Sequence, residues 1–310
     1  MIIIKYNGGL GNQMFQYANQ IALENRYKNQ IIKADLSHYQ LWNEHNGYEL
    51  HKVFNIKLNL AHPKEIRPLT NSYIVSAKLQ FLPDAVKHFL AYKYSYWYYR
   101  IGNVLKPHKQ KTDVRDGLYN EYNPQVEYLK EGSWYIHGVW LNTKYFSEYK
   151  EIISVSYSLK CELNQLDAMA LEQLRTGKAI AVHVRGGDFN NKYFDLCDKN
   201  YYRSALKNFL NNLPIYIFTD DIPFAKNKLA GMNIAGFISH GITESKKDMY
   251  MLSMSKYIIL SNSTFAFWGA YLNTEKKIVV APKYARFDGR TYWRFPVEDE
   301  WEVIDNRGRM

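Results

Sequence analysis

The residues best suited to chemistry in this chain lie between His183 and Asp188, in the segment His-Val-Arg-Gly-Gly-Asp that ends an apolar run. If the run is a strand, alternation places His183 and Arg185 on one face at its carboxyl end. A guanidinium group there suits a diphosphate, because its planar fork makes two charge-assisted hydrogen bonds. Asp188 follows on the turn, where it can orient Arg185 or accept a proton. The alternative is an Arg185–Asp188 pair that only fixes the turn.

Two further polar segments also follow predicted strands. Asp220 and Asp221 come after the apolar run 215–219, where a carboxylate can accept N–H bonds from a guanine edge or bind a metal. The sequence nearby offers none of the other carboxylates or histidines that a metal site needs, and ordinary helix capping explains the pair as well. Residues 261–264, Ser-Asn-Ser-Thr, join a strand to a helix and form a candidate phosphate site. Capping alone is again the simpler alternative.

A glycine-rich turn, residues 7–13, lies between the first predicted strand and helix. Backbone N–H groups at such a turn favour a phosphate or carboxylate. Gly9 and Gly11 match the first two glycines of the dinucleotide-binding fingerprint, but Met14 occupies the third position. Asp35 ends the next predicted strand, where a ribose-binding acid would lie. A dinucleotide-dependent oxidoreductase is therefore one interpretation, and a tight turn without a ligand is another.

The elements that must position these residues follow from the hydrophobic periodicity. Apolar runs predict strands at 2–4, 31–35, 134–140, 179–184, 215–219, 235–238, 257–260 and 278–281. Helical spacing predicts helices over 13–26, 202–213 and 265–272, and an aromatic-rich helix over 84–105. Strands that alternate with helices predict parallel sheets. We therefore expect two Rossmann-like domains that face a central cleft.

Composition limits the class of protein. The 310 residues are 46% hydrophobic and 23% charged, which fits a globular chain with a sizeable core. Two cysteines, Cys161 and Cys197, cannot form a disulfide framework and fit a reducing compartment. The sequence contains no apolar run long enough to span a membrane and no charged region ahead of its short apolar start. A cytoplasmic protein is the expectation.

Charge and aromatic content point to an anionic partner. The chain carries 40 Lys and Arg against 30 Asp and Glu, a formal net charge of +10, and 27 tyrosines. Residues 76–115 concentrate both features, which suggests docking on an anionic membrane, peripheral to the inner membrane, or on a lipid-linked glycan. The alternative is that these aromatic residues form the core of an acceptor domain. No recognised nucleic-acid-binding motif accompanies the stretch, so no nucleic acid partner is expected.

Taken in chain order, four segments resemble the bacterial α-1,2-fucosyltransferase family, glycosyltransferase family 11. The sequence has no nucleophile elbow, zinc-protease helix or P-loop that would favour another class. The four segments are residues 8–18 (Gly-Gly-Leu-Gly-Asn-Gln-Met-Phe-Gln-Tyr-Ala), 183–189 (His-Val-Arg-Gly-Gly-Asp-Phe), 217–221 (Ile-Phe-Thr-Asp-Asp) and 261–270 (Ser-Asn-Ser-Thr-Phe-Ala-Phe-Trp-Gly-Ala).

The resemblance implies a GT-B-like α/β fold, with an acceptor-side domain over residues 1–160 and a GDP-sugar donor domain over 161–310. It implies an inverting enzyme that moves L-fucose from GDP-β-L-fucose to a galactose 2-hydroxyl, without a cofactor or essential metal. The acceptor it implies is a galactose-terminated oligosaccharide, free or lipid-linked. A transferase for another nucleotide sugar or another fucosyl linkage is the alternative, and the oxidoreductase is the remote one.

The resemblance also assigns roles to residues. It implies that Arg185 holds the donor diphosphate and that His183 and one of Asp220 or Asp221 face guanine. We take Arg185 and Asp188 as catalytic, with Asp188 as the candidate base. The remaining donor-binding predictions are Gly9, Gly11, Asn12, Gln13, Ser263, Thr264 and Phe265. One departure is that the family commonly has a second arginine directly after the first, and here that position is Gly186.

Overall fold

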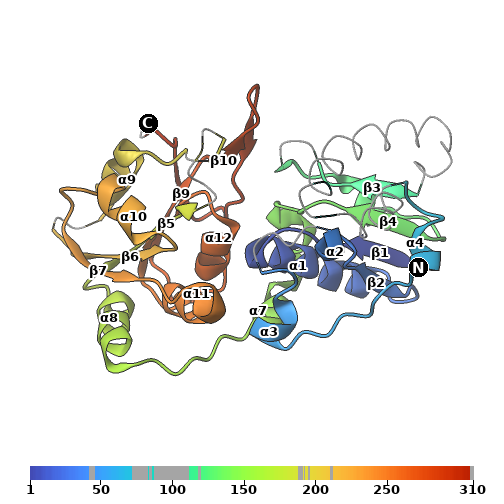
Figure 1. The fold of residues 1–310 in the computed structure, drawn as a ribbon, viewed down its shortest axis with the longest axis horizontal. Coiled ribbons are helices and arrows are strands. Elements are labelled where there is room, and N and C mark those ends of the chain that lie inside the picture. Colours follow the sequence, from blue (N-terminus) through green and yellow to red (C-terminus); the bar gives the residue numbers. More distant parts are fainter. Residues whose placement is uncertain are drawn as a thin grey trace. The chain divides into compact units, whose positions relative to one another are not determined.

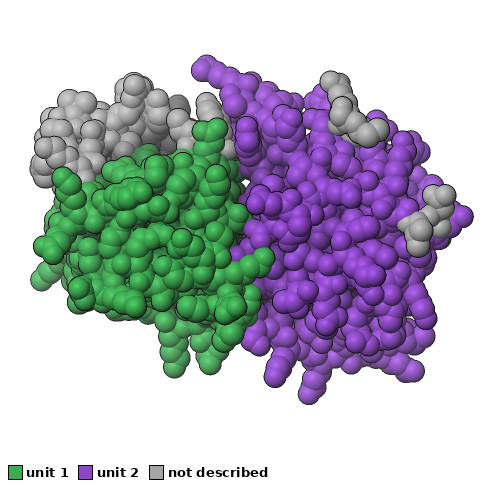
Figure 2. Space-filling view, turned by 180° about the vertical axis from the view of Figure 1, so that it is seen from behind, with its two compact units in different colours: residues 1–156 green, residues 157–310 purple. Residues whose placement is uncertain are grey.

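The computed structural model describes residues 1–41, 46–71, 83, 86, 112–117, 120–187, 191, 193–194, 196–209 and 212–307. The chain divides into two compact units, residues 1–156 and 157–310, shown in different colours in Figure 2. The boundary predicted from the sequence was 160/161, four residues further on. The aromatic helix predicted over 84–105 and the basic stretch 76–115 lie almost wholly outside the described residues.

The described part of unit 1 contains a parallel sheet of four strands in the order β2-β1-β4-β3. The strands are β1 (Ile2–Lys5), β2 (Ile32–Asp35), β3 (Asp113–Arg115) and β4 (Trp134–His137). The side chains of Ile2, Ile3 and Ile4 are fully buried, as the apolar run at the start of the chain requires. The first strand–helix–strand unit predicted from the sequence is confirmed.

Helix α1 (Leu10–Arg26) connects β1 to β2 and contacts both strands (Figure 1). Its buried side chains, which include Met14, Ala18 and Ala22, recur at the predicted helical spacing. The other α-helices of unit 1 are α2 (His38–Leu41), α3 (Leu50–Phe54), α4 (Pro63–Ile66) and α7 (Lys150–Ser156). Short 3₁₀ helices cover Pro124–Glu127, Thr143–Tyr145 and Ser147–Tyr149.

The described part of unit 2 contains a parallel sheet of six strands in the order β12-β9-β8-β5-β6-β7. The strands are β5 (Ile180–Val184), β6 (Ile215–Thr219), β7 (Ile234–Ile238), β8 (Tyr257–Ile259), β9 (Ile278–Pro282) and β12 (Glu302–Ile304). Numbered from β5, these strands lie in the order 6-5-4-1-2-3, which is the doubly wound Rossmann order. The two parallel-sheet α/β units confirm the predicted class of fold.

Five α-helices belong to the described part of unit 2 (Figure 1). They are α8 (Gln165–Thr176), α9 (Lys199–Leu206), α10 (Ile222–Lys228), α11 (Ser245–Ser253) and α12 (Thr264–Tyr271), and a 3₁₀ helix covers Ile242–Glu244. A buried cluster joins Val182 and Val184 of β5 to Tyr202 of α9 and Ala225 of α10. By alternation along β5, His183 lies on the opposite face of the sheet, as predicted.

The helix predicted over 202–213 is shorter at its C-terminal end than expected. Helix α9 ends at Leu206, and residues 207–209 form a turn. The apolar spacing continues to Leu213, but that residue precedes Pro214, and a residue before proline is disfavoured in helical conformation. Asn212 adopts the left-handed conformation, with a φ of 70°. The apolar side chains beyond Leu206 therefore pack from a loop, and Phe209 and Leu213 still join the buried cluster.

A histidine bridge ties three segments of unit 2 together. The Nδ1 atom of His240, after β7, lies 2.5 Å from an Asp248 carboxylate oxygen on α11, and its Nε2 atom lies 2.9 Å from Asp167 on α8. Burial lowers the pKa of His240, but the two carboxylates raise it more, and the net pKa lies above the ordinary value. Both ring nitrogens donate only when the imidazole is charged.

In the part of the chain that the structure describes, no helix is long and apolar enough to cross a membrane.

Candidate active site

The candidate site lies at the carboxyl edge of the unit 2 sheet, where the strand order reverses. Strands β5 and β8 are neighbours there. The strand that follows β5 in sequence, β6, lies on one side of this pair, and the strand that follows β8, β9, lies on the other. In doubly wound sheets this reversal opens a crevice outside the carboxyl ends of the strands, where ligands bind. Arg185 directly follows β5, and Ser261 and Ser263 follow β8. The topology therefore brings two of the predicted donor-binding segments to one place.

Arg185 is held by a carboxylate from the neighbouring strand. Its Nη1 atom lies 3.0 Å from Asp220 Oδ2, with side-chain exposures of 26% and 33%. The other oxygen of Asp220 accepts a hydrogen bond of 2.8 Å from the backbone N–H of Gly186. Val184 pairs with Thr219 in the sheet, so the residues that follow each strand are neighbours. Asp220 thus fixes both the guanidinium group and the turn that carries it.

The turn after Arg185 has no room for side chains. A Cβ atom on Gly186 would lie 2.5 Å from Asp221 Cβ and 3.3 Å from a ring carbon of Phe224. Gly187 has a φ of +46°, and a Cβ there would lie 2.9 Å from Asp220 Oδ2. A side chain at position 186, where the resemblance leads us to expect a second arginine, would therefore force the turn or Asp221 to shift. The close approach brings the Gly186 N–H within reach of Asp220.

His183 is buried and neutral. Its Nδ1 atom lies 2.8 Å from the hydroxyl of Ser261, a hydrogen bond that joins the ends of β5 and β8. Burial, with a smaller contribution from Arg185, lowers the pKa of His183 to about 3. Its ring centre lies 6.1 Å from that of Phe265. A neutral imidazole can offer one donor and one acceptor to a ligand and its neighbours, but no charge.

The segment after β8 leads into α12 through a buried turn. Ser263 is the N-cap residue of α12, and its side chain makes no capping hydrogen bond to the helix. The predicted alternative, in which this hydroxyl serves only as a cap, is therefore not what the structure shows. Thr264 and Phe265 form the first turn of the helix, where backbone N–H groups favour an anion.

Asn262 is a residue of this turn to which the sequence analysis gave no role. It is buried, and its amide nitrogen donates to the carbonyl groups of Phe194 and Ala285, at 2.8 and 2.7 Å. These bonds tie the turn to Phe194 and to Ala285, two residues that are distant from each other in sequence. The sequence does show a polar side chain between two serines in an otherwise apolar segment. That pattern could have marked Asn262 as a structural residue, but it does not identify its hydrogen-bond partners.

Asp221 caps a helix, as the helix-capping alternative predicted. Its carboxylate accepts a hydrogen bond of 2.9 Å from the N–H of Phe224, and it is the N-cap residue of α10. Both candidates for the one carboxylate predicted to face guanine are thus engaged within the protein, Asp220 with Arg185 and Asp221 with a helix end. Asp220 is the more exposed of the two.

The glycine-rich turn belongs to unit 1. Gly9 is the N-cap residue of α1, and its carbonyl group accepts hydrogen bonds from the N–H groups of Asn12 and Gln13. The Gln13 side chain is fully buried and bonds the carbonyls of Gly8 and Gly47 and the N–H of Glu49. It acts as a structural link in unit 1. Gly11 is buried in the first turn of α1.

Asp35 is not presented to a ligand in the way that the oxidoreductase interpretation requires. It is only 2% exposed, and its carboxylate accepts hydrogen bonds of 2.8 Å from the N–H of Ser37 and from the hydroxyl of Tyr135. A ribose-binding acid must offer its oxygen atoms to the ribose hydroxyls. Asp35 therefore does not support the dinucleotide-binding interpretation, which the absence of the third glycine had already weakened.

Asp188 lies outside the described residues, and its roles stay predictions. Across the ranges that the structure describes, no three His, Cys, Asp or Glu residues gather in a way that could hold a metal ion. Asp220 and Asp221 have the partners given above and form no such group.

The sequence was compared with known proteins. The sequence model of Glycosyl transferase family 11 matches residues 108–301. Alpha-1,2-colitosyltransferase of Escherichia coli is 31% identical, with 91% of each chain covered. The O-antigen biosynthesis glycosyltransferase WbnK of Escherichia coli is 25% identical over 89% of this chain and 92% of that protein. Galactoside 2-alpha-L-fucosyltransferase Sec1 of Mus musculus is 21% identical over 91% of this chain and 67% of that protein.

Proposed function

The chain belongs to glycosyl transferase family 11, and from this membership we propose that it moves L-fucose from GDP-β-L-fucose to the 2-hydroxyl of a galactose-containing glycan. It is a glycosyltransferase; the donor sugar, the acceptor and the linkage are the proposal. The main structural support for this proposal is the Arg185–Asp220 pair at the strand reversal of unit 2, beside the N-terminus of α12. A fixed guanidinium group next to a helix N-terminus suits a nucleoside diphosphate.

The proposed step is a single displacement at the anomeric carbon of fucose. The acceptor hydroxyl oxygen forms a bond to that carbon while the bond to the β-phosphate oxygen breaks. The electron pair leaves with GDP, and the hydroxyl proton passes to a base or to water. Attack from the face opposite the phosphate turns a β-linked donor into an α-linked product.

Arg185 stabilises the leaving group in this step. Negative charge develops on the β-phosphate as the bond breaks, and a donor that is already oriented does not have to reorganise. Asp220 supplies that orientation through its contacts with Arg185 and with the Gly186 N–H. Loss of one such donor typically costs about 10²–10³ in rate.

For the base we propose Asp188, because it follows Arg185 by three residues. The test is the Asp188→Asn variant, assayed for turnover between pH 5 and 9. We expect turnover to fall strongly and the acidic limb of the pH profile to disappear. Near-normal turnover with an unchanged profile would mean that the reaction uses no dedicated base at this position.

A second donor has specific support. The relative that is 31% identical carries the name of a colitosyltransferase, and colitose is L-fucose without its 3-hydroxyl group. The two sugars therefore share the same anomeric chemistry. An enzyme can distinguish the two sugars only through contacts to the 3-hydroxyl group. A site that hydrogen-bonds this hydroxyl strongly disfavours a sugar that lacks it.

The experiment pairs binding with product analysis. Calorimetry with GDP, UDP and NAD, with and without chelator, is followed by incubation with GDP-fucose or GDP-colitose and a galactose-terminated disaccharide. We expect GDP binding that survives chelation, and a product with a new α-1,2 linkage by NMR. NAD binding with no response to GDP would refute the proposal, and transfer of colitose alone would correct the donor.

A further inference from the structure

A two-stranded hairpin rises from the same edge of the sheet as the candidate donor site. Its strands are β10 (Tyr284–Phe287) and β11 (Tyr292–Arg294), paired antiparallel. It begins two residues after β9 ends, and β9 is parallel to β8 and β5, so the hairpin starts at their carboxyl edge. Figure 1 shows β10, in dark red, projecting beyond the body of unit 2. No prediction from the sequence gave this hairpin a role.

The base of the hairpin is bonded to the loops of the candidate site. Asn262, in the turn before α12, donates to the Ala285 carbonyl group at 2.7 Å. The N–H of Phe287 donates to the Tyr193 carbonyl group at 2.8 Å. Asn306 accepts from the Tyr284 N–H and donates to its carbonyl group. Of these residues, Asn262 belongs to the turn of the candidate donor site, so that turn and the hairpin are joined directly.

The tip of the hairpin is well ordered by its own turn. The Asp288 carboxylate accepts hydrogen bonds from the N–H groups of Arg290 and Thr291 and from the indole N–H of Trp293. These bonds lower the pKa of Asp288 to about 2. Gly289 takes the left-handed conformation, with a φ of 97°. The only carboxylate of the hairpin is thus committed to its turn.

The two faces of the hairpin carry aromatic rings. On one face the Tyr292 ring lies 4.8 Å from Tyr284 and 4.6 Å from Phe287, centre to centre. On the other, the Arg286 guanidinium lies 4.2 Å from the centre of the Trp293 ring. Tyr292 is 36% exposed. Flat aromatic surfaces with polar edges suit the apolar faces of sugar rings.

The hairpin is also strongly basic. Residues 283–294 include Lys283, Arg286, Arg290 and Arg294 against one carboxylate, Asp288. Among the described residues, no salt bridge joins Lys283, Arg286 or Arg290 to a carboxylate, and Arg290 is exposed. Arg286 and Lys283 stack on the rings of Trp293 and Tyr284, and Arg290 is exposed at the tip, where a cation attracts an anionic ligand. Aromatic rings and cations on one projecting element therefore suit a ligand that is both a sugar and an anion.

We propose that this hairpin binds the acceptor, and that the acceptor is an oligosaccharide joined to a phosphate or diphosphate group. Tyr292 and its ring neighbours stack on a sugar, and Arg286 and Arg290 bind the anionic group. The inference rests on the proposed function, because it takes the donor to lie in the loops that Asn262 ties to the hairpin. An anionic membrane would meet the same charges, but the position of the hairpin at the ligand edge favours the glycan.

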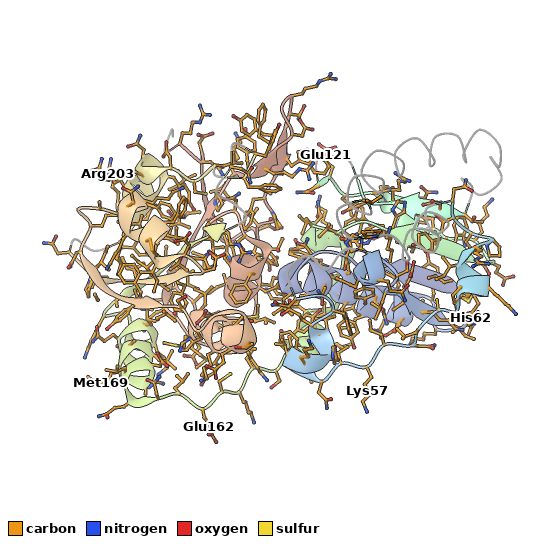
Figure 3. The ribbon with its side chains drawn as sticks, viewed as in Figure 1. Lys57, His62, Glu121, Glu162, Met169 and Arg203 are labelled. Atoms are coloured by element: carbon orange, nitrogen blue, oxygen red, sulfur yellow. The ribbon has the colours of Figure 1, made fainter. Side chains whose placement is uncertain are left out.

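The experiment compares two acceptors with the same galactose-terminated disaccharide, one on a neutral alkyl chain and one joined to that chain by a diphosphate. Binding of each is measured by calorimetry with GDP present, and KM and kcat are measured with the donor that the enzyme uses. The variants are Tyr292→Ala, Tyr292→Phe and Arg290→Gln. Two changes elsewhere on the surface serve as controls, Arg203→Gln on the exposed side of α9 (Figure 3) and Tyr128→Ala.

We expect wild-type protein to bind the diphosphate acceptor more tightly than the neutral one. Tyr292→Ala weakens binding of both about tenfold, Tyr292→Phe retains most of it, and Arg290→Gln weakens only the diphosphate acceptor, by about three- to tenfold. The KM for the donor and the behaviour of both controls stay at wild-type values. Arg290 lies at the exposed tip, so its variant remains informative if Tyr292→Ala disturbs the hairpin.

The proposal is overturned if both hairpin variants bind both acceptors as tightly as wild type. It is also overturned if they lose only co-sedimentation with vesicles of anionic phospholipid, which would make the hairpin a membrane contact. Failure of the proposed function has a different signature, because then wild-type protein transfers neither fucose nor colitose to either acceptor. Binding of the diphosphate disaccharide, and its loss in the variants, is still measured in that case.

Discussion

Replacement of Gly186 by alanine tests whether the turn after β5 holds Arg185 in place. The added Cβ would lie 2.5 Å from Asp221 Cβ, and non-bonded carbon atoms approach no closer than about 3.5 Å. The turn must therefore move by about 1 Å. The same displacement would stretch the 3.0 Å contact between Arg185 and Asp220 to about 4 Å, beyond hydrogen-bond range.

Two measurable losses follow from this displacement. Overpacking of this kind costs about 1–3 kcal/mol, and at about 2–4 °C per kcal/mol for a domain of this size the melting temperature falls by roughly 2–12 °C. A charge-assisted hydrogen bond contributes about 1.5–3 kcal/mol, so we expect the Kd for GDP to rise at least tenfold. Gly186→Arg meets the same contact and cannot restore the arginine that the family commonly has there.

The assays are calorimetry with GDP and thermal unfolding followed by circular dichroism. Gly236→Ala on β7 is the matched control, because its Cβ would meet only the half-buried ring of Tyr216, at 3.1 Å, and that side chain can move. The reasoning is refuted if Gly186→Ala binds GDP within twofold of wild type at an unchanged melting temperature. It is equally refuted if Gly236→Ala loses as much GDP affinity.

Three further predictions follow from the site and its surroundings. Arg185→Lys keeps the charge but loses the planar fork, so kcat/KM with the nucleotide sugar falls at least tenfold, and an unchanged rate would mean that another residue holds the diphosphate. His183 has a pKa of about 3 when folded and about 6.5 when unfolded, so the free energy of unfolding decreases as pH falls below 6.5. His183→Gln should lessen that loss in denaturant titrations at pH 5 and 7, and an equal loss in both proteins would contradict a neutral His183. The pH dependence that His240 gives to the free energy of unfolding has the opposite sign, because its folded-state pKa is raised. The stabilisation from His240 is complete below pH 6.5 and is lost as pH rises through the folded-state pKa. His240→Gln should therefore destabilise unit 2 more at pH 6 than at pH 9, and a loss that does not change with pH would disprove the charged bridge.

Local sequence patterns were sufficient to predict most of the strands that carry the site. Apolar runs at 179–184, 215–219 and 257–260 each appear as strands within a residue or two of the predicted ends. Polar residues at or just beyond the ends of such runs lie at a carboxyl edge, and the structure has His183, Arg185 and Ser263 at that edge of the unit 2 sheet. These predictions succeeded because strand period and burial depend on neighbours in sequence.

The partners of the site residues could not be predicted in the same way. The sequence analysis offered only Asp188, three residues away, as a partner for Arg185, and it did not find the contact with Asp220 that the structure shows. That contact depends on β5 and β6 being neighbours in the sheet, and no local pattern encodes strand order. The hairpin was missed for a different reason, since a register shift between Tyr284 and Arg286 interrupts the alternation that marks a strand.

Three hydrogen bonds explain why this edge of unit 2 can act as one preorganised surface. His183 to Ser261 joins the ends of β5 and β8, and Arg185 to Asp220 joins the ends of β5 and β6. Asn262 then joins the turn after β8 to the base of the hairpin. Each of these side chains would lose its partner if one strand end moved, and an unpaired buried polar group costs about 1–3 kcal/mol. A ligand at the strand reversal would therefore meet donors that are already in place, and the third of these bonds also holds the hairpin. Under our two proposals, the acceptor on the hairpin and the donor at Arg185 would bind elements that these bonds connect, and Asn262 is the residue that joins the hairpin to the turn after β8.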